Sequence, residues 1–382
     1  MIPLSVPQLA GNEWQYVKEC LDTNWISSAG AYVGRFEKMV AAFTDSPHAI
    51  ACMNGTAALH VAMRVAGVEN DTYVIAPNIT FVATCNAITY TGAIPLLVDV
   101  NPDSWQLDLE LLKRVLEQEC ATDEQGALRY KADGRKVSAI MPVHVLGNMC
   151  DMDRLGTMAH QYNLPIIEDS TEALGSAFRG QPAGTFGRFG TCSFNGNKVI
   201  STGGGGMVLC ANPEDAVRLK HLTTTAKTDP LDYFHDEVGY NYRLVNVLAA
   251  IGVAQMEQLS GFLEAKKVTD TFYRTSLAGV GDISFQTITP GVTPNNWLFT
   301  FRTAKMRALL AYLNANGVQS RPFWTPMNEL PMFAHVPYHT DQQHARLVHQ
   351  TAISIPSSSG ISQQERETVV REIKKFFAKH EA

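Results

Sequence analysis

Short apolar runs alternate with helix-period segments through the first two thirds of this chain. An apolar run at 49–54 leads into a helical pattern at 55–67, and a second run at 73–78 leads into another at 80–92. This alternation is the signature of βαβ units. Runs that are apolar nearly throughout are typical of strands buried on both faces of a mostly parallel sheet. The sequence therefore predicts an α/β fold.

The pattern changes after residue 245. A long helical pattern at 246–277 leads into a region with two later strand candidates, 297–302 and 351–356. We therefore predict a large domain, 1–245, built on a three-layer, mostly parallel sheet, and a smaller C-terminal α+β domain, 246–382. The charged stretch 120–136 interrupts the rhythm and is interpreted as a surface insertion. Other strand candidates lie at 94–100, 137–147, 164–170, 190–195 and 206–210, and other helices run from about Asp108 to Glu119 and from Met152 to Tyr162.

Composition narrows the class of protein. At 382 residues the chain is long enough for two domains around a sizeable core. A net charge of −6 argues against a nucleic-acid partner, which requires a basic face. The seven cysteines show no framework spacing and are interpreted as cytosolic thiols. The first residues lack a signal-peptide pattern, and no apolar stretch approaches membrane-spanning length, so we expect a cytoplasmic protein without a membrane partner.

The stretch SFNGNKVISTGGGGMV, residues 193–208, carries Lys198 followed by four glycines. A Walker loop places its lysine after the glycines, and here the lysine precedes them. A dinucleotide fingerprint opens a helix, whereas these glycines run into strand-like residues. A flexible linker would be longer and flanked by polar sequence. The remaining interpretation is a lysine fixed at a strand end, with glycines that let the backbone pack closely around a flat molecule.

Other polar residues stand at strand ends, where open α/β sheets bind their ligands. Gly55 and Thr56 precede a helix, which predicts an anion site, with plain helix capping as the alternative. Glu168 and Asp169 end a buried strand, where a carboxylate needs a cationic or donor partner or else caps the next helix. Ser193 closes another strand, and its hydroxyl can donate to an anion.

Phe81 and His144 are weaker candidates for site residues. Phe81 follows another strand-end turn, where a lone phenylalanine is usually a core residue. His144 lies in an apolar strand and is interpreted as a core histidine rather than a ligand. The sequence has no C-x-x-C pair, no H-E-x-x-H pattern, and no Ser-His-Asp or Cys-His arrangement with a motif around it. No metal site is predicted.

The order of these features along the chain fits one cofactor, pyridoxal phosphate. A helix N-terminus and Ser193 suit its phosphate, an aromatic ring stacks on its pyridine, and a strand-end carboxylate keeps the pyridine nitrogen protonated. Lys198 then forms the Schiff base with its carbonyl carbon. On this hypothesis, the glycines let the chain pack near the cofactor.

With these residues in place, the sequence resembles the DegT-type sugar aminotransferases, which have the aspartate aminotransferase fold (fold type I). The matching motifs cover nearly the whole chain in family order: NGTAAL, PNITFVAT, EDSTEALGS, SFNGNK, TGGGGMV, GYNYRLVNVLAA and RPFWTP. The resemblance implies that Lys198 is the Schiff-base lysine, Asp169 the partner of the pyridine nitrogen and Phe81 the stacking ring. It implies phosphate binding by three residues: Gly55, Thr56 and Ser193.

The resemblance implies further contacts. Glu172 would lie near the ring hydroxyl, where many members carry Gln. Asn195 stands where some members carry His, and it is a cofactor-binding candidate. Asn241 is similar to an asparagine that reaches the phosphate of the neighbouring subunit's cofactor, which implies a homodimer with shared active sites.

Within the family, TNWISSAG, the insertion 120–136, the four glycines and IPSSSG resemble most the branch serving the bacillosamine and legionaminic-acid pathways. This implies ping-pong amination, with glutamate as donor, at C4 of a nucleotide-linked 4-keto-6-deoxy-N-acetylhexosamine. Residues interpreted as sugar-nucleotide contacts, with aromatic core as the alternative for each tryptophan, are Trp25, Ser27, Trp297, Arg321 and Trp324.

Three other functions are alternatives to this one. A C3 aminotransferase of the same family would act on a similar nucleotide sugar. A non-catalytic pyridoxal-phosphate-binding regulator would normally bring a DNA-binding module, and no basic helix-turn-helix segment is visible. A sugar 3-dehydratase of the family replaces the lysine with histidine, so Lys198 argues against it.

Overall fold

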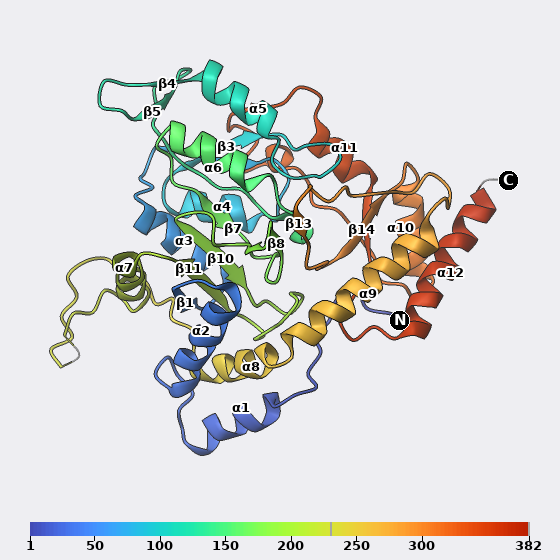
Figure 1. The fold of residues 1–382 in the computed structure, drawn as a ribbon, viewed down its shortest axis with the longest axis horizontal. Helices are drawn as coiled ribbons and strands as arrows, with labels where there is room; N and C mark the ends of the chain where they lie inside the picture. Colours follow the sequence, from blue (N-terminus) through green and yellow to red (C-terminus); the bar gives the residue numbers. More distant parts are fainter. Residues whose placement is uncertain (230, 381–382) are drawn as a thin grey trace.

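The computed structural model describes residues 1–229 and 231–380, and its centre is a sheet made of two four-stranded halves (Figure 1). One half has the strand order β1-β11-β10-β7 and the other β16-β3-β2-β6. Parallel bridges, one of them from Val143 to Asp169, connect the chain beyond β6 with β7 and join the halves. The strands are β1 (His48–Cys52), β2 (Tyr73–Pro77), β3 (Ile94–Val98), β6 (Val137–Ile140), β7 (Ile167–Asp169), β10 (Phe189–Ser193), β11 (Gly206–Cys210) and β16 (Tyr338–His339).

The joined sheet is mostly parallel. β11 runs antiparallel to both of its neighbours, β1 and β10. The other ladders of the two halves, β10 with β7, β16 with β3, and β2 with β3 and β6, are parallel. The predicted α/β fold on a mostly parallel sheet is therefore confirmed.

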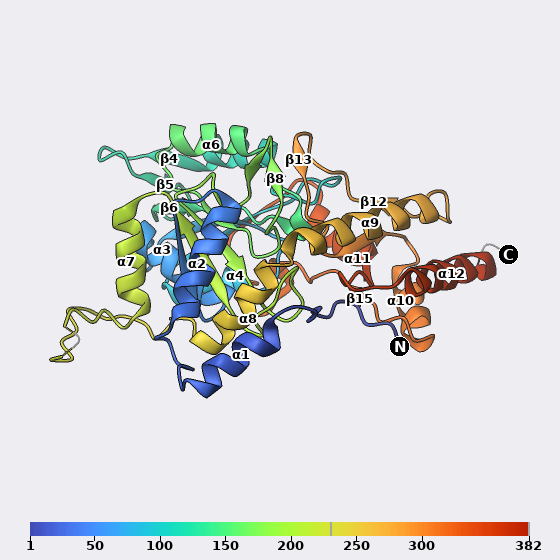
Figure 2. The same ribbon diagram turned by 60° about the horizontal axis from the view of Figure 1, so that its bottom comes forward.

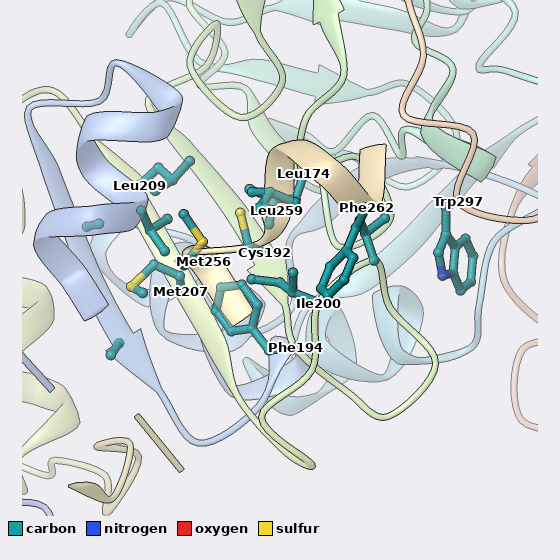
Figure 3. Packing of buried hydrophobic residues seen from close by; sticks show 14 of the residues in the cluster. Leu174, Cys192, Phe194, Ile200, Met207, Leu209, Met256, Leu259, Phe262 and Trp297 are labelled. Atoms are coloured by element: carbon teal, nitrogen blue, oxygen red, sulfur yellow. The ribbon is translucent and has the colours of Figure 1, made fainter. Parts of the chain in front are cut away.

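Helices cover both faces of the sheet, and the strands bury alternate residues on opposite sides. In β1, Ala49 and Ala51 pack in one cluster with α2 and α8, whereas Ile50 and Cys52 pack in another with α3 and α7. β11 alternates in the same way, and Figure 3 shows its Met207 and other members of the first cluster. The helices around the sheet are α1 (Glu13–Asp22), α2 (Ala31–Thr44), α3 (Gly55–Ala66), α4 (Ala83–Tyr90), α5 (Leu109–Arg114), α6 (Met152–Gln161), α7 (Pro213–Thr223), α8 (Asn246–Met256) and α11 (His344–Thr351).

Two predicted segments show local structure that the pattern did not indicate. The helix predicted from Asp108 begins there, because its carboxylate accepts the N–H groups of Glu110 and Leu111. Its last five residues, Val115–Glu119, form a π-helical turn. The predicted surface insertion folds as an antiparallel pair of short strands, β4 (Cys120–Thr122) and β5 (Leu128–Tyr130).

A second sheet lies in the C-terminal third, with strand order β12-β14-β17-β15. Its apolar side, which includes Phe301, packs in one cluster with residues of α9, α10 and α12, among them Tyr273 and Phe376. The bounds are α9 (Leu259–Leu277), β12 (Ser284–Phe285), β14 (Phe299–Arg302), α10 (Met306–Ala315), β15 (Arg321–Pro322), β17 (Ala352–Ile355) and α12 (Gln363–His380). A small third sheet, β13-β8-β9, contains β8 (Ala177–Phe178), β9 (Gln181–Pro182) and β13 (Val292–Thr293).

Contacts cross between the N-terminal and C-terminal parts. α8 packs on α1 and α2, and β16 pairs with β3 although it comes late in the chain. At the start of the chain, Ile2 forms a parallel bridge with Val318 beside β15. Figure 2 shows this N-terminal segment running beside β15 and α10. The division of the chain into domains after residue 245 stays a prediction.

The cysteines are free thiols in the interior. All seven are buried and unpaired. Within the described part of the chain, no helix is long and apolar enough to cross a membrane.

Candidate active site

A cavity of about 420 Å³ opens where the central strands end. Its wall includes residues that directly follow β1 and β2, the last residues of β7 and β10, and glycines just before β11. Because β11 is antiparallel to β10, its amino end meets the carboxyl ends of its neighbours at this edge. The cavity therefore lies where ligands of open α/β sheets bind.

Most of the predicted site residues meet in this cavity. Those that line it are Gly55, Thr56, Phe81, Asp169, Glu172, Ser193, Asn195, Lys198, Trp297, Arg321 and Trp324. The residues outside its lining are Trp25, Ser27 and Asn241, all three exposed on the chain surface. The roles assigned to all of these residues stay predictions.

The amine of Lys198 lies between a carboxyl group and an aromatic ring. Its Nζ is 3.8 Å from Oε1 of Glu172 and 4.1 Å from the ring centroid of Trp297. The backbone N–H of Lys198 donates to the carbonyl of Asn195 over 3.0 Å, which closes a turn after β10. Burial lowers the pKa of Lys198, and the charges of Glu172 and Asp169 oppose that shift. An amine with a lowered pKa in a cavity can accept and return protons near neutral pH.

Glu172 is a buried carboxyl group coupled to this amine. Burial raises the pKa of Glu172, while the charge of Lys198 and the N–H of Leu146 oppose the shift. That N–H donates to Oε2 over 2.9 Å. Leu146 has a φ of 60°, in the left-handed region that a leucine seldom adopts. The unusual backbone directs one N–H towards the carboxyl group at the site.

Glu172→Gln should move the acid limb of the pH profile of kcat to lower pH. The negative charge of Glu172 raises the pKa of Lys198, so its loss lets the amine release its proton at lower pH. We expect a shift of about one pH unit, at the low end for a close opposite charge. As a control, Glu110→Gln removes an exposed partner of Arg154 and should leave the limb in place. If the acid limb of the kcat profile stays in place in Glu172→Gln, Glu172 does not influence the titration of Lys198.

The Asp169 carboxylate is held in one orientation by two threonines. Its Oδ2 accepts the hydroxyl of Thr84 over 2.6 Å, and Oδ1 accepts the hydroxyl of Thr171 over 2.7 Å. The side chain is 2% exposed. A carboxylate fixed by donors at a buried strand end stays available to a cation in the cavity.

The neighbouring Glu168 points elsewhere. Its Oε2 lies 2.9 Å from Nε2 of His144, and the N–H groups of Gly184, Phe186 and Gly187 donate to its two carboxylate oxygens. Both side chains of the Glu168–His144 pair are fully buried. This confirms His144 as a core residue and leaves Asp169 as the strand-end carboxylate at the cavity.

The start of α3 forms an anion cradle with Ser193. Asn54 caps the helix by accepting the N–H of Ala57, and Gly55 and Thr56 then stand in the cavity wall. A Cβ added to Gly55 would lie 3.0 Å from the Cβ of Ser193, tighter than ordinary packing. The 12-residue helix directs the positive end of its dipole at this position. The cradle therefore suits a phosphate and leaves little room for a Cβ at Gly55.

The four glycines have separate local causes. Gly203 has a φ of 81°, which favours glycine. A Cβ on Gly206 would lie 2.4 Å from the carbonyl oxygen of Asn54. Gly204 and Gly205 line the cavity. The positive φ of Gly203 and the close packing of Gly206 on the backbone of Asn54 thus account for two of the four glycines.

The aromatic side chains differ in exposure. Phe81 is 53% exposed and its ring lies edge-on to Trp324, with centroids 6.4 Å apart. This excludes the core alternative for Phe81. Trp297 is 2% exposed, and its ring stacks near Trp324 with centroids 6.5 Å apart. Trp297 is therefore both a core residue and part of the cavity wall.

Sequence reasoning missed residues that act through the predicted ones. Thr84 and Thr171 orient Asp169, and Leu146 binds Glu172, yet none of them belongs to a chemical motif. Leu4 also lines the cavity, although it is distant in sequence from the other lining residues. Only Thr171 could have been found from the sequence, through its position two residues after the strand-end carboxylate of Asp169.

The donor set of the cavity fits pyridoxal phosphate. A helix N-terminus with little room for a Cβ at Gly55 matches a phosphate, and the exposed Phe81 offers a ring face. The fixed Asp169 carboxylate matches a protonated ring nitrogen. The Lys198 amine, mostly buried, matches an aldehyde carbon.

Comparisons with known proteins agree with this geometry. The model of the DegT/DnrJ/EryC1/StrS aminotransferase family matches residues 7–374. The chain is 35% identical over 378 residues to the GDP-perosamine synthase of Caulobacter vibrioides, covering 97% of this chain and 96% of the relative. It is 33% identical to the putative pyridoxal phosphate-dependent aminotransferase EpsN of Bacillus subtilis, covering 98% of this chain and 96% of that protein.

The fold is also similar to that of a solved structure. The PLP form of the putative sugar aminotransferase Spr1654 from Streptococcus pneumoniae superimposes with a TM-score of 0.87 at 25% identity. The superposition covers 99% of each chain. The similarity thus extends over the whole fold.

Proposed function

Because this chain belongs to the DegT/DnrJ/EryC1/StrS aminotransferase family, we propose that it transfers an amino group from glutamate to the C4 keto carbon of a nucleotide-linked 4-keto-6-deoxy-(N-acetyl)hexosamine. The protein is a pyridoxal-phosphate-dependent aminotransferase. The observation that carries the proposal is the Lys198 amine, held in a cavity that also contains the Asp169 carboxylate and a helix N-terminus.

The proposed nucleotide-linked substrate has support from a relative. The name GDP-perosamine synthase describes a protein that makes a GDP-linked sugar. The motifs TNWISSAG and IPSSSG support the finer choice of C4, through their resemblance to the bacillosamine and legionaminic-acid branch. Trp297, Arg321 and Trp324 line the cavity and are the proposed sugar-nucleotide contacts there.

We assign a task to each of the main residues. Gly55, Thr56 and Ser193 bind the phosphate of the cofactor through N–H and hydroxyl groups. Bound there, pyridoxal phosphate supplies a protonated ring that takes up the electrons of a carbanion. Asp169 holds the proton on the ring nitrogen. Lys198 moves a proton at its Nζ in each half-reaction, because its lowered pKa lets it serve as base and acid.

Purified holoenzyme tests this proposal. Glutamate should bleach the yellow colour, and a nucleotide-linked 4-keto sugar should restore it, with the new amine at C4 by NMR. A panel of GDP-, UDP- and dTDP-linked 4-keto and 3-keto sugars identifies the nucleotide and the carbon. Amination at C3 would favour the rival C3 aminotransferase, and colour that persists with every amino donor would contradict turnover. Alanine in place of glutamate is the donor control.

We propose that the enzyme is a homodimer joined in part by an arm, residues 225–229 and 231–240, which protrudes beyond α7 (Figures 1 and 2). At the arm, Leu231, Tyr233 and Val238 are 84%, 74% and 84% exposed. Exposed apolar side chains in one segment support a protein partner. An ion pair of Arg218 with Glu237 and a hydrogen bond between His221 and Asp236 link the arm to α7.

Asn241, at the base of this arm, allows a test of shared sites. Lys198→Ala and Asn241→Asp should each be inactive, and a re-associated mixture should regain about a quarter of wild-type activity. Half of the dimers would be hybrids, and one of the two sites in each hybrid would carry neither lesion. Mixing without subunit exchange is the control. No recovery despite proven exchange would assign each site to a single chain.

The proposed location is the cytoplasm. All seven cysteines are free thiols, which is typical of a reducing compartment.

A further inference from the structure

A second buried lysine lies behind the cavity wall. Lys266, on α9, is 2% exposed. Its Nζ donates to the carbonyl oxygens of Trp297 over 2.8 Å and of Ser357 over 2.6 Å. Burial lowers the pKa of Lys266 to about 7, and no charge among the described residues offsets this effect. An amine buried without a carboxylate partner is costly, which indicates a role beyond filling space.

One route from Lys266 to the active site runs through Trp297. The carbonyl of this residue binds the Lys266 amine, and its indole Nε1 donates to the carbonyl of Asn197 over 2.7 Å. The same ring lies 4.1 Å from the Nζ of Lys198. Figure 3 shows Trp297 with the cluster members Phe262 and Ile200. Lys266 thus holds the residue that contacts both the Lys198 side chain and the peptide before it.

The other route runs through the N-terminal segment. The carbonyl of Ser357 binds Lys266, and its N–H donates to the carbonyl of Leu4 over 3.0 Å. The next residue, Ser5, donates its hydroxyl to the carbonyl of Asn197 over 3.1 Å. The Asn197 carbonyl, directly before Lys198, therefore accepts two side-chain hydrogen bonds, and both routes lead back to Lys266.

We propose that Lys266 is a positioning residue of the active site. By holding the carbonyls of Trp297 and Ser357, it fixes the ring beside the Lys198 amine and the peptide that carries Lys198. The inference rests on the proposed function, since it takes Lys198 as the residue that bonds to the cofactor. Lys266 acts through these neighbours and does not line the cavity.

Two variants of the holoenzyme test this inference. Lys266→Met keeps an unbranched side chain of nearly the same length and removes both hydrogen bonds. Trp297→Phe keeps an aromatic ring but removes the indole donor. We expect each to lower kcat roughly tenfold or more, as misplaced reacting groups do. In Lys266→Met, whose side chain lies outside the cavity lining, KM for the sugar should stay within about twofold of wild type. The double variant should lose less than the product of the two effects, because both changes break one network.

A pH titration of the cofactor absorbance gives a readout that is independent of turnover. The ring of Trp297 favours a positive charge on the Lys198 nitrogen, so a displaced ring should lower the titration midpoint by about half a pH unit. Lys267→Met, at the exposed neighbouring position on α9, is the matched control and should titrate as wild type.

The possible outcomes distinguish a positioning role of Lys266 from a purely structural role. If Lys266→Met lowers the melting temperature but keeps the wild-type midpoint and kcat, Lys266 only supports the fold. If Lys266→Met fails to fold, the test rests on Trp297→Phe. A wild-type titration midpoint and a wild-type kcat in Trp297→Phe would overturn the inference. If the wild-type cofactor proves to be bonded to a residue other than Lys198, the proposed function fails first.

Discussion

Lys198→Ala is expected to reduce amino transfer by at least about 10⁴-fold, because it removes both the amine that bonds to the cofactor and the proton carrier at that position. Cofactor should still bind without a covalent bond, since the cradle at α3 and the Asp169 carboxylate remain in place. The variant should also stay folded, because the side chain projects into the cavity and its loss leaves the packing of the sheet intact.

The measurement is twofold. Steady-state assays give the rate, and borohydride reduction followed by peptide mapping shows which lysine bonds to the cofactor. Wild-type protein should carry the reduced cofactor on Lys198, and the variant should carry none. Lys220→Ala, at an exposed position of α7, is the control and should label as wild type. Fixation to another lysine, the buried Lys266 included, would contradict the assignment.

Asp169→Asn should slow the half-reaction with glutamate by at least about 100-fold, the size typical of a lost electrostatic stabiliser. The amide keeps the shape of the side chain but removes the charge that keeps the ring nitrogen of the cofactor protonated. That charge matters most when carbanion charge develops, so turnover should fall more than ground-state binding. One of the two threonine hydroxyls, Thr84 or Thr171, can still donate to the amide oxygen of the variant, and the other can accept from the amide NH2 group.

Stopped-flow absorbance with glutamate measures this rate directly. Asp151→Asn is the matched control, because Asp151 caps α6 by accepting the N–H of Arg154 and lies outside the cavity lining. It should leave the half-reaction unchanged. A near-wild-type rate in Asp169→Asn would make Asp169 equivalent to such a cap.

The sequence pattern predicted the sheet well, because buried parallel strands and their following helices impose strong local signals. The helix expected from Met152 to Tyr162 is observed as Met152–Gln161. The strands β4 and β5 were not predicted, since two short strands in a polar stretch carry too few apolar residues to show a period. The π-helical turn Val115–Glu119 also left no pattern, because its residues keep helical spacing.

The site could be predicted where its residues stand at strand ends. Asp169 and Ser193 end β7 and β10, and Lys198 lies in the turn that follows β10, so all three meet in one cavity. Leu4 and the network behind Trp297 could not be predicted, because their contacts span long stretches of sequence and use backbone carbonyls that any residue provides. The predicted role of Asn241 involves a second chain, so local pattern alone could not place it.

The strand order has a consequence for folding. β1 lies at the end of its half of the sheet and pairs with β11, so synthesis must reach Cys210 before β1 can be closed into the sheet. Such distant pairing slows folding and leaves a strand edge open to aggregation in the meantime. The backbone of Gly206 in β11 packs on Asn54, so the phosphate cradle at α3 is completed by the same late step. The cofactor can therefore stabilise only molecules that have finished this step, and cofactor supply during expression should raise the yield of folded enzyme.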